Sequence, residues 1–506
     1  MNRGRLWMVA LTILAAALAA PAAEAGKSDD TLRVGWDREL ESLDVYYNNS
    51  REAINLSYHI GDSLLYRNPE TNQYLPALAT SWKWIDQLTL ELEIRKGVVA
   101  HNGEVVDAED VVYTLNFVSD PANGIKLQRN VEWIKRAEKV DQHRVRIHLK
   151  KPAPAALEYL SGPLVIYPRE YHMTAGLTGM AVKPVATGPY KVTAVSPGRE
   201  VTLERHDRYF EGSPKGKPAI KRIVIRTIPE ANTQLAELMT GGIDWIWKVP
   251  PDQVEKLGKM RGISVVNGET MRIGFLGFDA TGRTGKTPFT DLRVRRAIGH
   301  AVNRQAIVDN LLKGASKVIH SACFPTQFGC TDGVMKYEYD PAKAKRMLAE
   351  AGYPNGFETE LYAYQDRNFA EALIGDLSKV GIKANLRFLQ LAAYNEKRDA
   401  NGTPMLFGTW GSYSINDSSA GPSRWFKHDK ADYARDQQVR DWLEVADTSV
   451  DPNVRKEHYA KALKRIAEQA YWLPLFSYNL NYAFNSDLEF KPDPDEVTRF
   501  FGARWK

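Results

Sequence analysis

The segment from residue 80 to residue 117 constrains the fold most, because its hydrophobic period changes once within it. Apolar and polar side chains alternate over residues 88–94, which is the pattern of a strand with one buried face. An Asn-Gly pair at 102–103 marks a turn. Asp107 and Asp110 then have the spacing of a capping box at the start of a helix. The segment therefore predicts a strand, a turn and a helix in one unit.

The rest of the chain continues this alternation of strands and helices. A chain of 506 residues is long enough for two or three packed lobes. Alternating strands and helices favour an α/β fold. We expect strands at 32–36, 201–205, 220–228, 271–278 and 358–364, and helices at 231–239, 340–352, 369–380, 454–470 and, as a single helix, at 292–312.

Composition argues against a nucleic-acid-binding protein. Hydrophobic residues make up 43% and charged residues 25%, which is ordinary for a globular protein, and the net charge of +5 is not gathered in a basic block. The ten histidines are scattered and form no H-E-x-x-H motif, and there is no G-x-S-x-G elbow. We expect no catalytic residue, no metal site and no cofactor, although paired carboxylates would leave no sequence motif.

The amino-terminal segment has the layout of a secretory leader. Arg3 and Arg5 precede an apolar run over 6–20, and an A-x-A end follows at 23–25. A membrane anchor is the alternative, but the run is shorter than the ~20 apolar residues that span a bilayer. We expect cleavage after Ala25 and a mature chain that is free in the periplasm.

Two cysteines, Cys323 and Cys330, lie beyond the leader. An exported chain meets an oxidising compartment, which favours a disulfide between them. The alternative is a metal site, but no further cysteine and no histidine at ligand spacing completes one.

The segment ATGRTGKT at 280–287 fits a relaxed phosphate-binding loop. Such a loop needs a first glycine and a helix that starts directly behind it. Here alanine replaces that glycine, and Pro288 removes a backbone donor at once. We interpret the segment as a connecting loop.

Several long motifs together resemble the family 5 extracellular solute-binding proteins, the peptide, nickel and opine receptors of ABC importers. They occur in the family's order and cover most of the chain beyond the leader. The motifs are PALATSW at 76–82, ELEIRKGVVAHNGEVVDAEDVVYTL at 91–115, TGPY at 187–190, IPEANTQLAELMTGGIDW at 228–245, DLRVRRAIGHAVNRQAIVDNLLKG at 291–314 and DPAKAKRMLAEAGYPNG at 340–356.

The resemblance implies a two-lobed periplasmic-binding-protein fold of class II, cluster C type, with an extra subdomain. The first lobe would be discontinuous, and the second would follow it in the chain. The expected parts are the leader 1–25, lobe I at 26–68, 186–282 and 480–506, the inserted subdomain at 69–185, and lobe II at 283–479.

The resemblance also implies a function. The chain would capture a peptide or peptide-like small solute by closing its lobes, and would deliver it to the transmembrane subunits of an ABC permease. An oligosaccharide, an opine or a metal complex is the alternative solute. A periplasmic hydrolase is the alternative class, and a chaperone or signalling receptor on the same fold is another. We expect a monomer that binds no nucleic acid and is not an enzyme.

The expected ligand contacts follow from family position. Peptide receptors of this family carry W-x-x-D after a strand, where the Asp pairs with a peptide amine. Aligning on Trp410 puts Tyr413 at that Asp, unless Asp417 supplies the charge from a shifted register. Tyr46 and Asn48 follow the first strand toward the cleft. The ordinary interpretations are a core aromatic for Trp410 and a polar loop for the last two.

Overall fold

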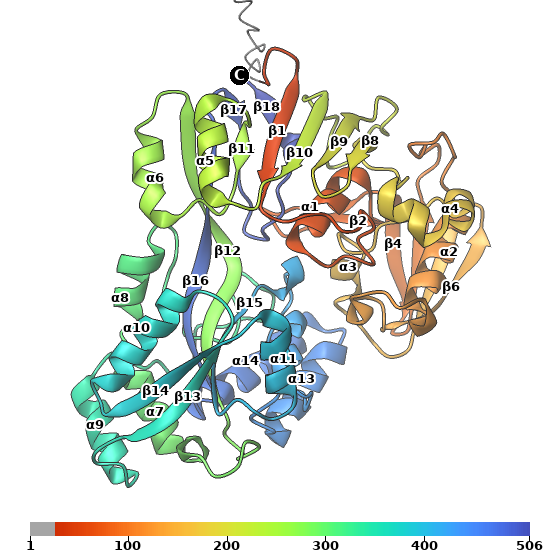
Figure 1. The fold of residues 1–506 in the computed structure, drawn as a ribbon. Helices are drawn as coiled ribbons and strands as arrows, with labels where there is room; N and C mark the ends of the chain where they lie inside the picture. The colour runs from red at the N-terminus through yellow and green to blue at the C-terminus, as the bar shows by residue number, and fades with distance from the viewer. Residues whose placement is uncertain (1–25) are drawn as a thin grey trace, which may run out of the picture.

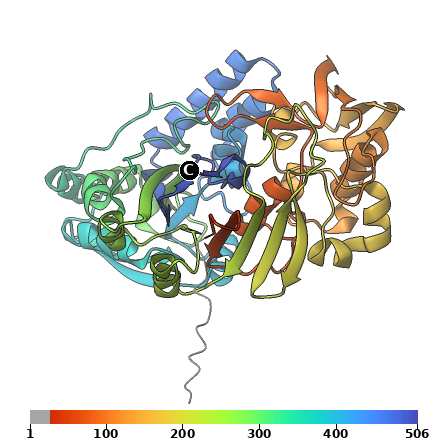
Figure 2. The same ribbon diagram turned by 90° about the horizontal axis from the view of Figure 1, so that it is seen from above.

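A computed structural model describes residues 26–506, so the predicted leader and its cleavage lie outside the described residues. Figure 1 shows one lobe at the top, a second lobe below it and a subdomain on the right. Figure 2 shows from above that this subdomain lies beside strands β8 to β10 of the first lobe. No helix formed by residues 26–506 is long and apolar enough to cross a bilayer.

The first lobe is built on the strands around β1. Strand β1 pairs in parallel with β10 and β11, and β10, β9 and β8 continue as an antiparallel edge. Its elements are β1 (Thr31–Trp36), α1 (Arg51–Ile60), β8 (Tyr190–Ser196), β9 (Glu200–Arg205), β10 (Arg222–Thr227), α5 (Ala231–Thr240), β11 (Trp245–Ile246), α6 (Pro251–Gly258), β17 (Leu488–Glu489), η7 (Phe500–Gly502) and β18 (Arg504–Trp505).

The inserted subdomain contains the unit that residues 80–117 predict. Its antiparallel sheet has the order β4-β5-β7-β6, and α2 begins with the expected capping box of Asp107 and Asp110. Its elements are β3 (Tyr74–Pro76), β4 (Ala79–Asp86), β5 (Thr89–Ile94), α2 (Ala108–Ser119), η1 (Pro121–Asn123), η2 (Gln128–Asn130), β6 (Ile134–Asp141), β7 (Arg144–Leu149), α3 (Ala156–Tyr159) and α4 (Arg169–Val182). Strand β2 (Leu65–Arg67), which ends just before the predicted start of the subdomain, pairs with β3.

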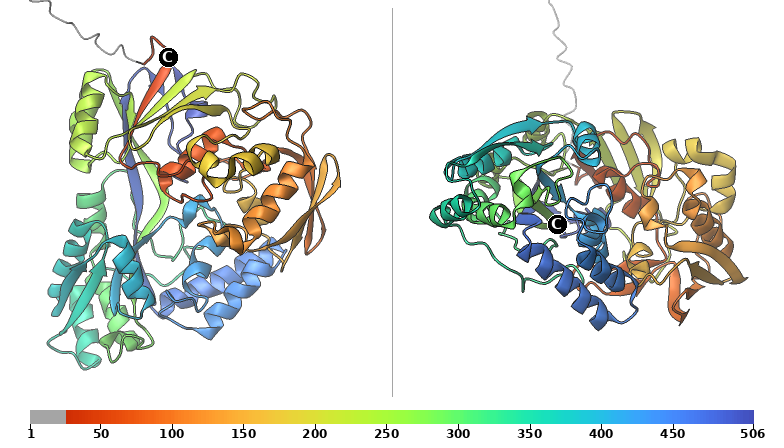
Figure 3. Two further views of the ribbon diagram at one scale, coloured as in Figure 1. Left: turned by 45° about the vertical axis from the view of Figure 1, so that its right-hand side comes forward. Right: turned by 90° about the horizontal axis from the view of Figure 1, so that it is seen from below.

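The second lobe packs helices around parallel strands β14, β13 and β15. Its elements are η3 (Pro288–Thr290), α7 (Leu292–Ala301), α8 (Arg304–Ile307), η4 (Val308–Leu312), α9 (Pro341–Glu350), β13 (Phe357–Ala363), α10 (Arg367–Ser378), β14 (Ile382–Phe388), α11 (Leu391–Asp399), β15 (Met405–Trp410), η5 (Ser412–Ser414), η6 (Ser418–Ala420), α12 (Pro422–Trp425), α13 (Gln437–Thr448) and α14 (Pro452–Glu468). In the left view of Figure 3, α13 and α14 pass beneath the subdomain.

Two long strands join the lobes. β12 (Ile263–Phe278) and β16 (Trp472–Asn485) pair antiparallel along most of their length and run from the top lobe into the lower one (Figure 1). They sit at the centre of a ten-stranded sheet of order β14-β13-β15-β12-β16-β11-β1-β10-β9-β8. The two strands therefore form the hinge between the lobes.

Two predicted elements differ from the structure. The predicted strand at 271–278 begins eight residues earlier, at Ile263. The predicted single helix at 292–312 breaks after Ala301, because Val302 is extended. The side chain of Asn303 then accepts the Ala306 amide and caps a new helix, α8. The ATGRTGKT segment is a connecting loop, as expected, and Thr287 caps the short η3 helix behind it.

The predicted division into lobes and subdomain stays a proposal, and the hydrophobic cores support it. One core gathers residues of the subdomain, a second the residues of the lower lobe, and a third the discontinuous segments of the first lobe. Exceptions include Tyr46, Leu64 and Leu65, which pack in the core of the subdomain, and Ala77, which packs in the core of the first lobe.

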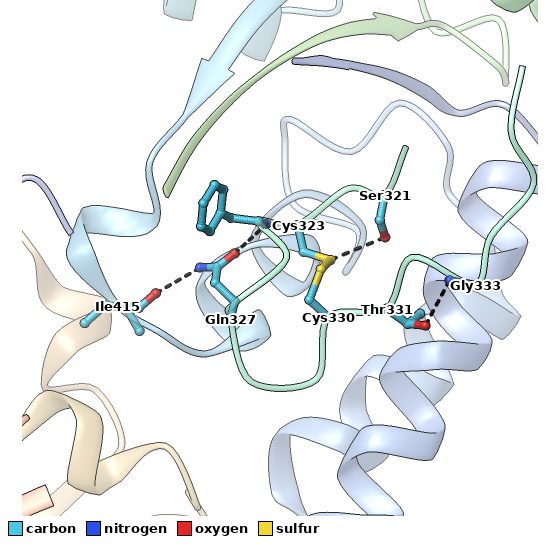
Figure 4. Close-up of a disulfide and its surroundings, with 8 residues drawn as sticks. Ser321, Cys323, Gln327, Cys330, Thr331, Gly333 and Ile415 are labelled. Carbon is cyan, nitrogen blue, oxygen red and sulfur yellow. Dashed lines mark hydrogen bonds between the residues drawn. A yellow bond between two sulfur atoms is a disulfide. The ribbon is translucent and has the colours of Figure 1, made fainter. Parts of the chain in front are cut away.

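The expected disulfide between Cys323 and Cys330 is present (Figure 4). It closes a loop that presents Gln327. The side chain of Gln327 accepts a hydrogen bond from the Phe324 amide at 3.0 Å and donates one to the Ile415 carbonyl at 2.9 Å. The disulfide loop therefore braces the chain that follows β15.

Candidate ligand-binding cleft

A cavity of about 570 Å³ lies where the three parts of the molecule meet. We call it the cleft cavity. Its volume is in the range of small-molecule sites. Its walls come from the start of α1, from the subdomain around η2, from the hinge strand β12, and from β15, α11, α12 and the end of β13 in the second lobe, where Tyr364 directly follows β13. The lining residues lie within 49–54, 126–132, 272–275, 391–398, 408–413 and 424–425, with Tyr364.

A bulge in the hinge strand brings Arg272 to this cavity. The register of β12 against β16 shifts between Glu269 and Ile273, and such a bulge re-aims the side chains within it. Arg272 contacts both carboxylate oxygens of Glu496 at 3.1 Å, and Arg51 reaches the same carboxylate at 3.0 Å. Burial raises the pKa of Glu496, but the two guanidinium groups outweigh it, so that pKa lies below its ordinary value.

The loop that follows β15 has a left-handed backbone. Ser412, Tyr413 and Ser414 have φ angles of 51°, 50° and 68°, a region that residues other than glycine rarely occupy in succession. Such conformations persist where the surroundings hold them. Arg51 of the first lobe donates to the Ser414 hydroxyl, which donates to the Asp495 carbonyl at 2.6 Å. Groups of one lobe therefore fix a loop of the other.

A buried network, which we call the latch, holds the same loop. Arg67 lies 3.0 Å from Glu158 and 3.0 Å from Asp495, and donates to the Ser414 carbonyl at 3.2 Å. Glu158 also accepts the Asn416 amide at 2.7 Å. Burial raises the pKa of Glu158 despite the charge of Arg67. The latch therefore connects the first lobe, the subdomain and the second lobe, and its charged side chains are paired with one another.

Aromatic side chains form one wall of the cleft cavity. The Trp410 ring meets Tyr413 and Trp425 edge to face, at centroid distances of 5.1 and 5.4 Å. Trp425 meets Phe275 in the same way at 5.7 Å. The indole N–H of Trp410 donates to the Ala420 carbonyl at 2.6 Å, which fixes the ring. This wall offers rigid apolar surface to a ligand.

Two guanidinium groups of the second lobe lie over Trp425. Arg398 and Arg424 are each 5.3 Å from a Trp425 ring centroid, which orients both by cation–π attraction. Each also has a carboxylate neighbour, Asp399 at 2.8 Å for Arg398 and Asp429 for Arg424.

The subdomain contributes charges that lack such partners. Within residues 26–506, the side chains of Lys126 and Arg129 form no hydrogen bond or ion pair. Glu132 is the one carboxylate among the residues that line the cavity. Burial, and after it the positive charge of Arg129, lowers the pKa of Arg424 across the cavity.

A second cavity of about 790 Å³ lies on the other side of the same loop. We call it the outer cavity. It is lined by residues of the subdomain (72–84, 154–158), the disulfide loop (326–331), Asn416, Asp417 and the region of α14 (450–460). Here both carboxylate oxygens of Asp417 lie 2.9 Å from Arg455 Nη2, and both residues are buried.

The structure brings two of the five expected contact residues to the cleft cavity. Trp410 and Tyr413 line it, whereas Asp417 lines the outer cavity instead. Tyr46 is buried and donates to the Val165 carbonyl at 2.7 Å, beside a small apolar cavity of about 30 Å³. Asn48 donates to the Ser42 carbonyl at 3.0 Å, and its neighbour Asn49 lines the cleft. Contact of any of the five with a ligand stays a prediction.

Sequence reasoning missed the cations of the cleft. Lys126, Arg129, Arg398 and Arg424 stand on short helices and loops that have no motif. The one local signal is the succession Arg424-Trp425, where a cation directly precedes an aromatic residue. Among residues 26–506 there is no group of three histidine, cysteine or acidic side chains placed to hold a metal ion.

Comparison with known proteins finds a family of solute-binding proteins and relatives that are named as binding proteins. Residues 73–433 match the family described as bacterial extracellular solute-binding proteins, family 5 Middle. Heme-binding protein A of Haemophilus influenzae is 29% identical over 379 residues, 69% of this chain and 68% of that protein. The glutathione-binding protein GsiB of Escherichia coli strain K12 is 27% identical over 96% of this chain and 95% of its own length.

A solved structure agrees with these relatives. The periplasmic binding protein DppA of Helicobacter pylori, in complex with the peptide STSA, superposes with a TM-score of 0.79 at 25% identity. The superposition covers 95% of this chain and 99% of that one. The two-lobed fold with an added subdomain is therefore the fold of this chain.

Proposed function

We propose that this chain, which belongs to the bacterial extracellular solute-binding proteins of family 5, captures a peptide or peptide-like solute in the cleft cavity and delivers it to an ABC permease. The observation that carries the proposal is a cavity of about 570 Å³ with walls from both lobes, the hinge and the subdomain. A ligand there gains its full set of contacts only when these parts come together, so binding shifts the lobes toward closure.

Aromatic and charged side chains of the cleft have different roles in binding the solute. The wall of Trp410, Tyr413 and Trp425 buries apolar parts of the solute, and the guanidinium groups and backbone groups of the lining set its orientation. The relatives support a peptide-like solute, since one is named for glutathione and a solved structure holds a peptide.

The cellular setting belongs to the same proposal. The leader over residues 1–25 directs export, its removal leaves the mature chain in the periplasm, and the chain acts as a monomer. The protein binds and releases its solute unchanged, without catalysis. Closure presents both lobes to the permease, whose separate ATPase supplies the energy of transport.

Equilibrium dialysis of the mature protein against a mixed pool of tripeptides tests the proposal. We expect the protein to retain peptides at up to one per chain and to leave the pool chemically intact. Trp410→Ala should weaken retention, because the cleft loses its fixed apolar surface. Trp84→Ala is the matched control, since Trp84 lines only the outer cavity. Hydrolysis of the pool, or equal loss in both variants, would contradict the proposal.

A further inference from the structure

The cleft cavity has more positive charge than its own carboxylates compensate. Arg51 and Arg272 share Glu496, and together they form a closed group. Lys126 and Arg129 have no such neighbour among the residues that the structure describes. Arginine cannot lose its charge at any ordinary pH, so this excess persists whenever the cavity is empty.

Arg129 and a further cation of the lining, Arg424, whose own partner is Asp429, come to the cavity from different parts of the molecule. Arg129 belongs to η2 of the subdomain, and Arg424 belongs to α12 of the second lobe. These parts approach each other when the lobes close. Like charges that approach in a partly buried site repel. Burial lowers the pKa of Arg424, and the positive charge of Arg129 lowers it further, as expected for two like charges that line one cavity.

We infer that the solute is an acidic peptide, and that one of its carboxylates lies between Arg129 and Arg424 and joins the two sides. This inference rests on the proposed function and narrows its substrate class. A carboxylate between two guanidinium groups turns their repulsion into two charge-assisted contacts, so closure becomes favourable only with the anion present. Trp425 beneath Arg424 keeps that guanidinium in place before the solute arrives.

The cavity offers little to a cationic solute. Asp417, the carboxylate expected to meet a peptide amine, is held by Arg455 in the outer cavity. Glu132 is the remaining carboxylate of the cleft lining, and it is exposed. Recognition therefore depends on the acid groups of the solute more than on its amine.

Three tripeptide pools test the inference. Each has a random central residue between two identical residues, which are Glu in the first pool, Gln in the second and Lys in the third. The mature protein is dialysed against all three at neutral pH and physiological ionic strength, and the retained peptides are counted by mass spectrometry. We expect the Glu pool to be retained at least about tenfold better than the Gln pool, the size of effect that one charge-assisted contact supplies.

Matched variants locate the preference in the cleft. Arg129→Gln and Arg424→Gln should each remove most of the preference for the Glu pool over the Gln pool. Arg136→Gln removes an exposed arginine of β6 that is paired with Glu138, and it should change nothing. The unfolding midpoint of each variant shows that it is folded.

The outcomes distinguish failure of the inference from failure of the proposed function. Retention of the Gln or Lys pool as strongly as the Glu pool, or an unchanged preference in both cleft variants, overturns the inference and leaves the proposed function standing. Retention of none of the three pools contradicts the peptide-binding function itself, and the inference fails with it.

Discussion

The two cavities on either side of the loop after β15 differ in how their charges are compensated. In the outer cavity, Glu158 pairs with Arg67, and Asp417 pairs with Arg455, all of them buried. In the cleft cavity, Lys126 and Arg129 have no partner within residues 26–506. Buried paired charges hold parts of a protein together, whereas unpaired charges around a cavity are available to a ligand.

This difference predicts separate consequences for substitutions at the two places. A change near the outer cavity should lower stability and leave the choice of solute alone. A change among the cleft cations should alter the choice of solute at little cost in stability.

The largest effect is expected for Arg67→Ala in the latch. The substitution leaves Glu158 buried without its cation and removes one of the partners of Asp495. Loss of one partner of a buried ion pair costs about 3–5 kcal/mol. Urea unfolding of the variant and the parent protein measures the loss. A change below about 1 kcal/mol would show that water compensates these carboxylates and that the latch does not hold the lobes.

The next effect is expected when the Cys323–Cys330 disulfide is removed. The bridge closes a short loop, and chain-entropy arguments give such a loop about 2.5 kcal/mol of stabilisation. The Cys323→Ala/Cys330→Ala double variant should unfold at lower urea concentration and keep its preference for acidic peptides. A changed preference would mean that the disulfide loop, through Gln327 and Ile415, also shapes the cleft.

A smaller effect is expected from the buried imidazole of His59. Its Nδ1 donates to the Asn55 carbonyl at 2.7 Å, and its Nε2 accepts the Phe500 amide at 3.1 Å. Burial lowers the pKa of His59 from 6.5 to about 3. The unfolded chain therefore takes up the proton first, so the stability from His59 is complete above pH 6.5 and is lost as pH falls toward 3.

The His59 contribution should reduce the free energy of unfolding by about 2 kcal/mol at about pH 5. His59→Gln removes the titrating ring, so its stability should fall less between neutral pH and about pH 5. His143→Gln, in the turn between β6 and β7, is the control. An equal pH dependence in the His59 variant and the parent would contradict the assignment.

The smallest effect is expected for Lys151→Ala. Lys151 of the subdomain lies 2.9 Å from Glu444 of the second lobe, so this pair crosses the same boundary as the latch, but it is exposed. Exposed pairs contribute about 0.2–1 kcal/mol. The variant should unfold almost as the parent does, and the shift should shrink further at high salt. A loss as large as that of Arg67→Ala would show that burial does not distinguish the two pairs.

The parts of the fold that follow from local signals were predictable from the sequence. The capping box of Asp107 and Asp110 starts α2 because its hydrogen bonds depend only on neighbouring residues. The beginning of β12 was missed because the bulge at 270–272 interrupts the alternation and Gly268 lies ahead of it. The break at Asn303 was missed because the apolar stripe continues on both sides of it.

The candidate site was predictable only in part. Trp410 and Tyr413 could be assigned to the cleft lining because they occupy the first and last positions of the family's W-x-x-D motif after a strand, with Tyr413 in place of the Asp. Arg129 and Arg424 lie far apart in the sequence, and only tertiary packing brings them to one cavity. A single arginine in a short helix has no local signal that separates it from a solvated surface residue.

Mass spectrometry of the solute that remains bound to protein isolated from its native host shows whether the cleft cavity holds an acidic peptide. We predict one small peptide-like solute per chain, with a net negative charge at neutral pH. A neutral or cationic solute, or one too large for a cavity of about 570 Å³, would contradict the account.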